Sequence, residues 1–318
     1  MPRKRRIDYQ IDLVSRIRVR RAIGRLSHTL VQPRTYRRYS QMVQSFVSWV
    51  RAHNIDVASD LEQLDFQLCE WIEALWAHGR PAGDAGATLS GVQFFLRRKR
   101  VLHSAWNLLK AWQRTEMPQR APPMPEYVLM SLATVARSWS RNDVAVLLVI
   151  GYSVFLRTME LLTLRKWQLQ FSNDGLSLVI ALPVTKAGKR RHCEESVTLH
   201  DARIVHFVRV LTQHLPPDAP LLQGTVPEFR DVFKALLKSL NLERQGYQIY
   251  SLRRGGATTH YRRFENMGLT LVTGRWQDTA VARIYISDGV QTLLQNDFLP
   301  VELERFRVLA GALNFDVG

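Results

Sequence analysis

Two neighbouring arginines of this chain are followed by very small residues. The sequence over 250–261 reads YSLRRGGATTHY, in which Arg253 and Arg254 precede Gly255 and Gly256. Burying two guanidinium groups is costly unless anions pair with them, and glycine lets the backbone or a ligand come very close. Taken alone, the stretch fits a solvated basic turn that leads into a helix over 258–264. With suitable partners elsewhere in the chain, it predicts an anion site.

Other side chains in the second half of the chain could act on the same anion. Arg157 ends the apolar part of GYSVFLRTMELLTLR, and Glu160, three residues later, could hold it on one helical face. Lys186 in TKAGKRR is a further cation, Trp276 in TGRWQDT carries an indole N–H, and Tyr285 in VARIYISDG carries a phenol. Taken singly, each has a plain structural role as an ion pair, a soluble turn or a packed aromatic ring.

Together, these residues resemble the tyrosine recombinase, or phage integrase, family. GYSVFLRTMELLTLR is similar to the family's first arginine box, LPVTKAGKRR to the hairpin that carries its lysine, and SLRRGGATTH to its second arginine box. Trp276 and Tyr285 are 285 − 276 = 9 positions apart, as are the family's His or Trp and its nucleophile. The resemblance extends from about Thr35 to beyond Tyr285.

The resemblance implies site-specific cleavage and rejoining of DNA. Tyr285 would attack the scissile phosphate and form a 3′-phosphotyrosyl link, and Lys186 would protonate the leaving 5′-oxygen. Arg157 and Arg253 would clamp the phosphate with paired hydrogen bonds, and Trp276 would add a donor. The link conserves bond energy, so rejoining needs neither ATP nor metal. The supporting residues would be Glu160, Arg254, Gly255 and Gly256, with Arg254 on the flanking DNA backbone.

One position departs from the family pattern. Three residues before the second arginine the family usually has a His, and this chain has Tyr250. A tyrosine hydroxyl can donate and accept a hydrogen bond, but it carries no positive charge near neutral pH. Tyr250 therefore counts among the catalytic candidates, but it also favours an alternative hypothesis, a catalytically weakened recombinase that only binds DNA. A type IB topoisomerase-like enzyme, which uses the same phosphotyrosyl chemistry, is a third hypothesis.

The composition favours a nucleic-acid partner. The 318 residues include 44 Lys and Arg against 28 Asp and Glu, a net charge of +16, which attracts a polyanion such as double-stranded DNA. The longest apolar run, Val144 to Leu156, is shorter than the ~20 residues of a membrane span. The N-terminus MPRKRRIDYQ lacks the apolar core of a signal peptide. We expect an intracellular protein, nuclear in a eukaryote and in the cytoplasm or nucleoid of a prokaryote.

The sequence predicts no metal, nucleotide or other cofactor. It contains two cysteines, Cys69 and Cys193, and neither a paired CxxC nor an HExxH motif. TKAGKRR lacks the first Gly and the Ser or Thr of a phosphate-binding GxxxxGK[ST] loop.

Two domains are expected to position the candidate residues. Residues 1–31 form a basic arm, and apolar residues at steps of three and four predict a helical core-binding, DNA-clamping domain over 32–115. Its first helix would be capped by Thr35, and a Pro/Gly-containing loop would run from Pro81 to Gly86. Four prolines in EMPQRAPPMPE, residues 116–126, mark a linker. Residues 127–318 form the catalytic domain.

The predicted fold is mainly α: the helical core-binding domain plus an α+β catalytic domain with a small β-hairpin or sheet. Strands over 176–184 and 193–199 would form the hairpin. Apolar residues Leu303, Phe306, Leu309 and Leu313 predict a C-terminal helix that packs on its own domain or docks on a neighbouring protomer, giving a homo-oligomer on DNA. The predicted DNA-contacting residues are Lys189, Arg190 and Arg191 at the hairpin tip and Arg97, Arg98, Lys99 and Arg100 in the helical domain.

Overall fold

A computed structural model places most of the chain in helices, with one small sheet, and the predicted fold class is confirmed. The chain divides into two compact units, Met1–Gln119 and Arg120–Gly318. The structure describes residues 13–24, 30–56, 58–98, 100–116, 120–183 and 194–313. Five predicted site residues lie outside these ranges: Lys99, Lys186, Lys189, Arg190 and Arg191.

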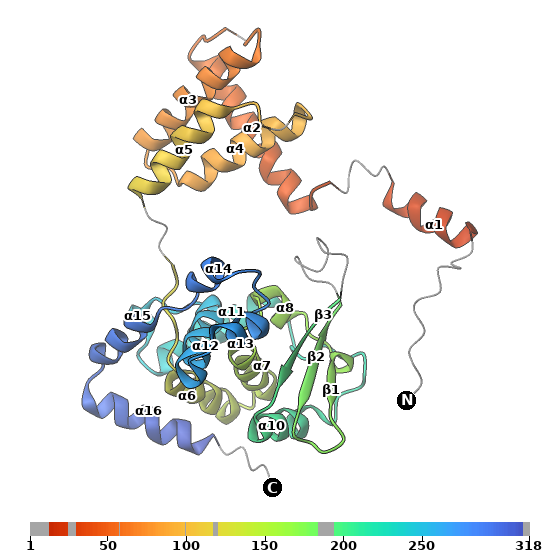
Figure 1. The fold of residues 1–318 in the computed structure, drawn as a ribbon, viewed down its shortest axis with the longest axis vertical. Coiled ribbons are helices and arrows are strands. Elements are labelled where there is room, and N and C mark those ends of the chain that lie inside the picture. Colours follow the sequence, from red (N-terminus) through yellow and green to blue (C-terminus); the bar gives the residue numbers. More distant parts are fainter. Residues whose placement is uncertain are drawn as a thin grey trace. The chain divides into compact units, whose positions relative to one another are not determined.

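The regular elements in the described part of the N-terminal unit are all helices (Figure 1). A core of apolar side chains, among them Phe46, Leu68, Leu89 and Leu109, joins its last four helices. Arg97, Arg98 and Arg100 follow the fourth helix and are exposed. The helices are α1 (Leu13–Ile23), α2 (Pro33–Ala52), α3 (Leu61–Ala77), α4 (Ala82–Phe95) and α5 (His103–Thr115).

Two local predictions for this unit are wrong. Helix α2 begins at Pro33 after Gln32, so Thr35 is not its cap, because a proline at the first helical position already provides the required backbone angle. The loop predicted from Pro81 to Gly86 is instead the start of α4. The buried carboxylate of Asp84 in that turn pairs with Arg38 and Arg80, which stabilises a helical start that the glycines alone do not favour.

The C-terminal unit contains most of the helices. An apolar run makes α7 buried along most of its length, and α6, α10, α12 and α16 lie around this core. The helices are α6 (Glu126–Ser138), α7 (Asn142–Ser153), α8 (Thr158–Leu162), η2 (Lys166–Gln168), α10 (Ala202–Thr212), α11 (Val226–Ser239), η3 (Glu243–Gln245), α12 (Ile249–Phe264), α13 (Met267–Gly274), α14 (Thr279–Arg283), α15 (Asp288–Leu293), η4 (Leu294–Asp297) and α16 (Pro300–Ala312).

A three-stranded antiparallel sheet lies on one side of these helices (Figure 1). Strands β2 (Leu178–Leu182) and β3 (Glu195–Leu199) form the predicted hairpin, with Ile180 opposite Val197. Strand β1 (Leu169–Phe171), which the sequence did not predict, adds to the free edge of β2. Lys186 lies between β2 and β3 in the sequence and outside the described residues. The structure therefore describes the two strands of the predicted lysine hairpin but not the position of the lysine.

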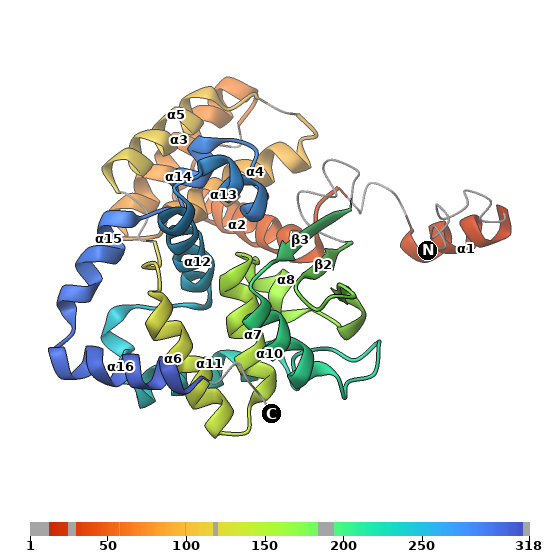
Figure 2. The same ribbon diagram turned by 60° about the horizontal axis from the view of Figure 1, so that its bottom comes forward.

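Helix α16 runs along α6 of the same unit, as the turned view in Figure 2 also shows. Phe306 is buried between Tyr127 and Phe298, and its carbonyl accepts a hydrogen bond of 3.0 Å from the Ser131 hydroxyl. The apolar face predicted for this helix is thus covered by its own chain.

Candidate active site

Helix α12 carries the arginine pair, and its glycines determine how closely it packs. The helix begins at Ile249, so residues 253–257 are helical rather than the turn that the isolated stretch suggested. A Cβ on Gly255 would lie 2.0 Å from the carbonyl oxygen of Met124, and one on Gly256 would lie 1.9 Å from that of Tyr152. Only glycine allows this approach, which draws α12 against the end of α7 and buries Arg253.

Arg253 is the most deeply buried cation of the site, with 1% of its surface exposed. Its Nη1 donates to the carbonyl of Phe155 and its Nη2 to the carbonyl of Gly274 at 2.9 Å. Its Nε is buried and has no partner among the described residues. Burial, followed by the charges of Arg157 and Arg275, lowers the pKa of Arg253 to about 10. The site therefore holds a cation that is short of anions.

Two aromatic rings cover this guanidinium. Its central carbon lies 4.9 Å from the ring centre of Trp276 and 5.0 Å from that of Tyr285, and the two rings stack 4.7 Å apart. Trp276 is buried, and its indole Nε1 has no partner in the described part of the chain. An unpartnered buried donor is unfavourable in the free protein, so Nε1 and the Arg253 Nε are both available to an acceptor that enters.

The Tyr285 hydroxyl is held by Tyr250. The Tyr250 hydroxyl donates to the Tyr285 hydroxyl oxygen at 2.7 Å, and the ring centres lie 5.9 Å apart. Burial, together with this bond, raises the pKa of Tyr250 to about 12. Tyr250 therefore remains a neutral donor at physiological pH, in the position where the resembling family usually has a His.

Short backbone interactions place Tyr285 at the end of α14. Asp278 caps this helix by accepting from the Val281 amide at 2.8 Å, and the Tyr285 amide donates to the Ala282 carbonyl at 2.9 Å. Thr258 of α12 accepts a hydrogen bond of 3.1 Å from the Ser287 amide. The segment with Tyr285 is thus tied to the helix that carries Arg253.

Arg157 lies at the N-terminus of α8 and pairs with Glu160 as predicted. The Arg157 Nη1 lies 2.6 Å from Glu160 Oε1, and its backbone amide donates to Oε2 at 2.9 Å. Although burial opposes ionisation, the charge of Arg275 and the bonds from Arg157 hold the pKa of Glu160 below its ordinary value. Glu160 is therefore an anion that fixes Arg157, whose side chain is about a third exposed.

Arg254 is placed differently from the prediction that it contacts the flanking DNA backbone. It is buried, and its Nη1 and Nη2 donate to the carbonyl of Ala121 at 2.6 Å and to the hydroxyl of Ser287 at 2.5 Å. Because α12 is helical here, consecutive residues point about 100° apart, and Arg254 faces the protein instead of the rings. It ties the segment before α6 to the segment after Tyr285.

Arg275 belongs to the same cluster and was not a predicted site residue. Its Nη2 lies 2.7 Å from Glu160 Oε2, and its side chain is 5% exposed. The sequence offered one signal, a long cation directly between Gly274 and Trp276 in TGRWQDT. Only the fold shows that this cation faces Glu160, which lies more than a hundred positions earlier in the chain.

The structure thus brings Arg157, Arg253, Tyr250, Trp276 and Tyr285 together, with Lys186 outside the described residues. Such a group matches the needs of phosphoryl transfer, in which guanidiniums and N–H donors stabilise negative charge on the phosphate oxygens and a phenol serves as nucleophile. No group of three His, Cys, Asp or Glu that could bind a metal occurs among the described residues. No helix in the described ranges is long and apolar enough to span a membrane.

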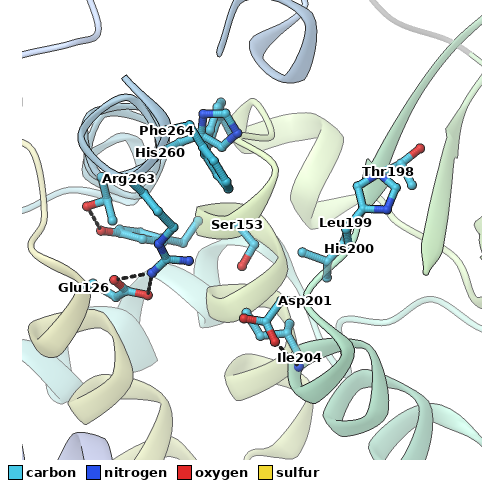
Figure 3. Close-up of a pocket in the computed structure, with 14 residues that line it drawn as sticks. Glu126, Ser153, Thr198, Leu199, His200, Asp201, Ile204, His260, Arg263 and Phe264 are labelled. Atoms are coloured by element: carbon cyan, nitrogen blue, oxygen red, sulfur yellow. Dashed lines mark hydrogen bonds and ion pairs between the residues drawn. The ribbon is translucent and has the colours of Figure 1, made fainter. Parts of the chain in front are cut away.

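A separate cavity of about 320 Å³ opens on another side of α12 (Figure 3). His260 and Arg263 of α12 border it, Arg263 pairs with Glu126 at 3.0 Å, and His200 lies on the side of the strands. Neither Arg253 nor Tyr285 lines it. The cluster of Arg157, Arg253 and Arg275 is therefore distinct from this cavity.

Comparisons with known proteins agree with the architecture. No protein-family model and no curated protein matches the sequence. Among solved structures, the chain is similar to the XerH site-specific recombinase bound to difH substrate in a pre-cleavage complex, at a TM-score of 0.53 and 13% identity over 86% of this chain and 77% of that one. It is also similar to XerH on palindromic difH in a post-cleavage complex, at a TM-score of 0.56 and 14% identity over 86% and 78%. The chain has the fold of the tyrosine recombinases.

Proposed function

We propose that this protein cleaves and rejoins double-stranded DNA at specific sites through a 3′-phosphotyrosyl intermediate on Tyr285. The observation that carries the proposal is the position of the Tyr285 ring over the buried Arg253, with its hydroxyl held at 2.7 Å by Tyr250. A phenol in contact with the guanidinium of Arg253, which has no carboxylate partner among the described residues, is suited to attack a phosphodiester, because this cation favours both the phenolate and the phosphate.

In the proposed reaction, the Tyr285 oxygen forms a bond to phosphorus while the bond from phosphorus to the 5′-oxygen breaks. Arg157 and Arg253 hold the nonbridging oxygens, and the indole N–H of Trp276 adds a donor. Tyr285 loses its proton to solvent water, the Tyr250 hydroxyl stabilises the phenolate that forms, and Lys186 gives a proton to the leaving 5′-oxygen. Rejoining is the reverse attack by a 5′-hydroxyl, so no external energy source is required.

The partner is double-stranded DNA, bound first through its phosphates. The two similar XerH structures are described as complexes with their difH substrates. In this chain the net charge of +16 and the exposed Arg97, Arg98 and Arg100 are suited to phosphate contacts. The first 31 residues act as a basic arm, residues 32–115 as the core-binding clamp and 127–318 as the catalytic domain, joined by the linker over 116–126. The setting is intracellular, the nucleus in a eukaryote and the cytoplasm or nucleoid in a prokaryote, and the biological event is recombination or integration of a mobile element.

A second candidate function, DNA binding without cleavage, is favoured by one observation. Tyr250 remains neutral where the resembling family usually has a His, so the site lacks one group that could exchange a proton near pH 7. If this loss is disabling, the arginine cluster would hold DNA without opening it.

The test uses a library of random duplexes nicked just downstream of each possible cleavage point, so that the cut end diffuses away. Native protein should form adducts with DNA that survive SDS, and sequencing them would reveal the preferred site. The Tyr285→Phe variant should bind the same DNA and form none. If native protein binds the DNA tightly and in a salt-dependent way but forms no adduct, the second candidate function is supported instead.

A further inference from the structure

Arg275 occupies a backbone conformation that glycine adopts more readily than arginine. It follows α13 with φ +55, in the left-handed region, and its amide donates to the Val272 carbonyl at 3.1 Å. Residues with a Cβ are disfavoured in this conformation, and helices commonly end in it with Gly or Asn. An arginine at this position carries a conformational cost that a glycine would not. This cost indicates that the Arg275 side chain has a role of its own.

The Arg275 side chain is buried and only partly satisfied. It is 5% exposed, its Nη2 pairs with Glu160, and its Nε and Nη1 are buried without a partner among the described residues. Burial lowers its pKa, although Glu160 opposes this effect. A buried guanidinium with two unused donor nitrogens is expected to satisfy them with an acceptor from outside the free protein.

Glu160 links Arg275 to Arg157. Its Oε1 accepts from the Arg157 side chain, while its Oε2 accepts both the Arg157 amide and Arg275 Nη2. Without Arg275, Oε2 would lose one of these bonds, and the carboxylate that orients Arg157 would be free to turn. Arg275 can therefore affect Arg157 through Glu160.

The charges around this carboxylate do not balance. Three guanidiniums belong to this cluster, and the charges of Arg157 and Arg275 each lower the stability of the charged form of Arg253. Glu160 and Glu195 are the acidic side chains that act on Arg275. Among the described residues, three guanidiniums against these two carboxylates leave one positive charge, which a phosphodiester would neutralise.

We propose that Arg275 is a positioning residue of the strand-transfer site: it fixes Glu160, and through it Arg157, and it is the third cation around the bound phosphate. The inference rests on the proposed function. It concerns a residue that the sequence motifs do not include.

The first experiment compares native protein with Arg275→Gly, Arg275→Lys and the control Ser140→Gly. Ser140 is exposed with φ +58, so its variant reproduces the change to glycine in a left-handed conformation away from the site. At saturating protein on the nicked duplex, Arg275→Gly should form adducts roughly 10- to 100-fold more slowly. Loss of the buried pair with Glu160 lowers the stability of this variant while relief of the left-handed backbone raises it, so the rates are compared at a temperature where each protein is folded. Arg275→Lys, which keeps the charge but not the planar fork, should recover part of the rate.

A double-mutant cycle separates positioning from plain destabilisation. If Arg275 acts through Glu160, the combined Arg275→Gly and Glu160→Gln variant should lose less activity than the product of the single losses. An Arg275→Gly protein that is folded and cleaves at the native rate overturns the inference while leaving the proposed function intact. So does a loss of rate that is fully independent of Glu160.

A second measurement does not require catalysis. Inorganic phosphate should raise the melting temperature of native protein and of Ser140→Gly, and the rise should be smaller for Arg275→Gly or, if that variant does not fold, for Arg275→Asn. If native protein forms no adducts, but the variant still shows the smaller phosphate-induced rise in melting temperature, the anion site is supported although the proposed strand transfer fails. An equal rise in native and variant proteins would overturn the inference in either case.

Discussion

At the residue scale, position 250 sets how the nucleophile is held. The Tyr250 hydroxyl donates to Tyr285 at 2.7 Å, and its pKa of about 12 means that it neither gains nor loses charge between pH 5 and 9. An imidazole at this position would titrate near pH 6.5 and could accept the proton of Tyr285 when neutral. Tyr250 can stabilise the phenolate but cannot take up that proton.

The Tyr250→His variant should therefore acquire a pH dependence near pH 6.5 that Tyr250 does not contribute in native protein. Imidazole is protonated below about pH 6.5 and is a base above it, so the rate of adduct formation should rise as the pH increases through this value. The measurement is the single-turnover rate from pH 5 to 9, with Tyr250→Phe as the control that has neither the donor nor the base. Identical profiles for the native and His proteins would mean that position 250 takes no part in proton transfer.

At the element scale, the packing of α12 depends on two glycines without room for a methyl group. Gly256→Ala would bring a Cβ to within 1.9 Å of the Tyr152 carbonyl oxygen, which belongs to backbone and cannot turn away. We expect a loss of about 1–3 kcal/mol in the free energy of unfolding, with slower cleavage because Arg253 would shift with the helix. Urea titration measures the stability loss.

The matched control for α12 is Gly289→Ala in α15, where an added Cβ meets nothing within 4 Å. This variant should keep or slightly raise stability, by up to about 1 kcal/mol, because alanine favours the helix. If Gly256→Ala were as stable as this control, the close approach of α12 to α7 would not be required.

Helix α16 provides a test of assembly. Phe306 is buried against α6, so Phe306→Ala should cost roughly 3–5 kcal/mol of stability. Val308 is exposed on the same helix, and Val308→Asp should leave stability unchanged. If protomers pair through the outward face of α16, sedimentation on DNA should show that Val308→Asp still binds single sites but no longer forms multimers. Multimers of unchanged size would exclude that face.

The elements that the sequence predicted best are those with strong local patterns. The apolar run 144–156 predicted the buried helix, and the mostly apolar segment 176–184 predicted the first strand of the hairpin. Strand β1 is only three residues long and exists because β2 offers it an edge, which no local pattern shows. The start of α4 depends on Asp84 meeting Arg38, a contact between distant segments.

Prediction of the site followed the same division. The order and spacing of Arg157, Arg253, Trp276 and Tyr285 indicated the cluster, because these residues recur in recognisable local phrases. The contact of Arg275 with Glu160 and the contacts of Arg254 with Ala121 and Ser287 could not be predicted. They depend on the direction in which each side chain points once the helices have packed. The Tyr250–Tyr285 bond likewise joins residues 35 positions apart.

At the scale of the whole molecule, the excess of positive charge should govern affinity. Each phosphate contact made by Arg97, Arg98 and Arg100 should contribute about 0.9 to the slope of log affinity against log salt. Replacing all three by Gln should therefore reduce that slope by roughly three without changing sequence preference. Fluorescence anisotropy at several salt concentrations measures it. An unchanged slope would mean that these three arginines do not contact DNA phosphates.

The central claim is that Tyr285, and not its hydrogen-bonded neighbour, becomes joined to DNA. Trypsin separates the two hydroxyls, because Tyr250 falls in the peptide 245–253 and Tyr285 in 284–305. Mass spectrometry of the protein–DNA adduct after nuclease and trypsin treatment identifies the modified peptide. We predict a nucleotide on Tyr285 in 284–305. A nucleotide on Tyr250, or the absence of any adduct from protein that binds the duplex, would contradict the account.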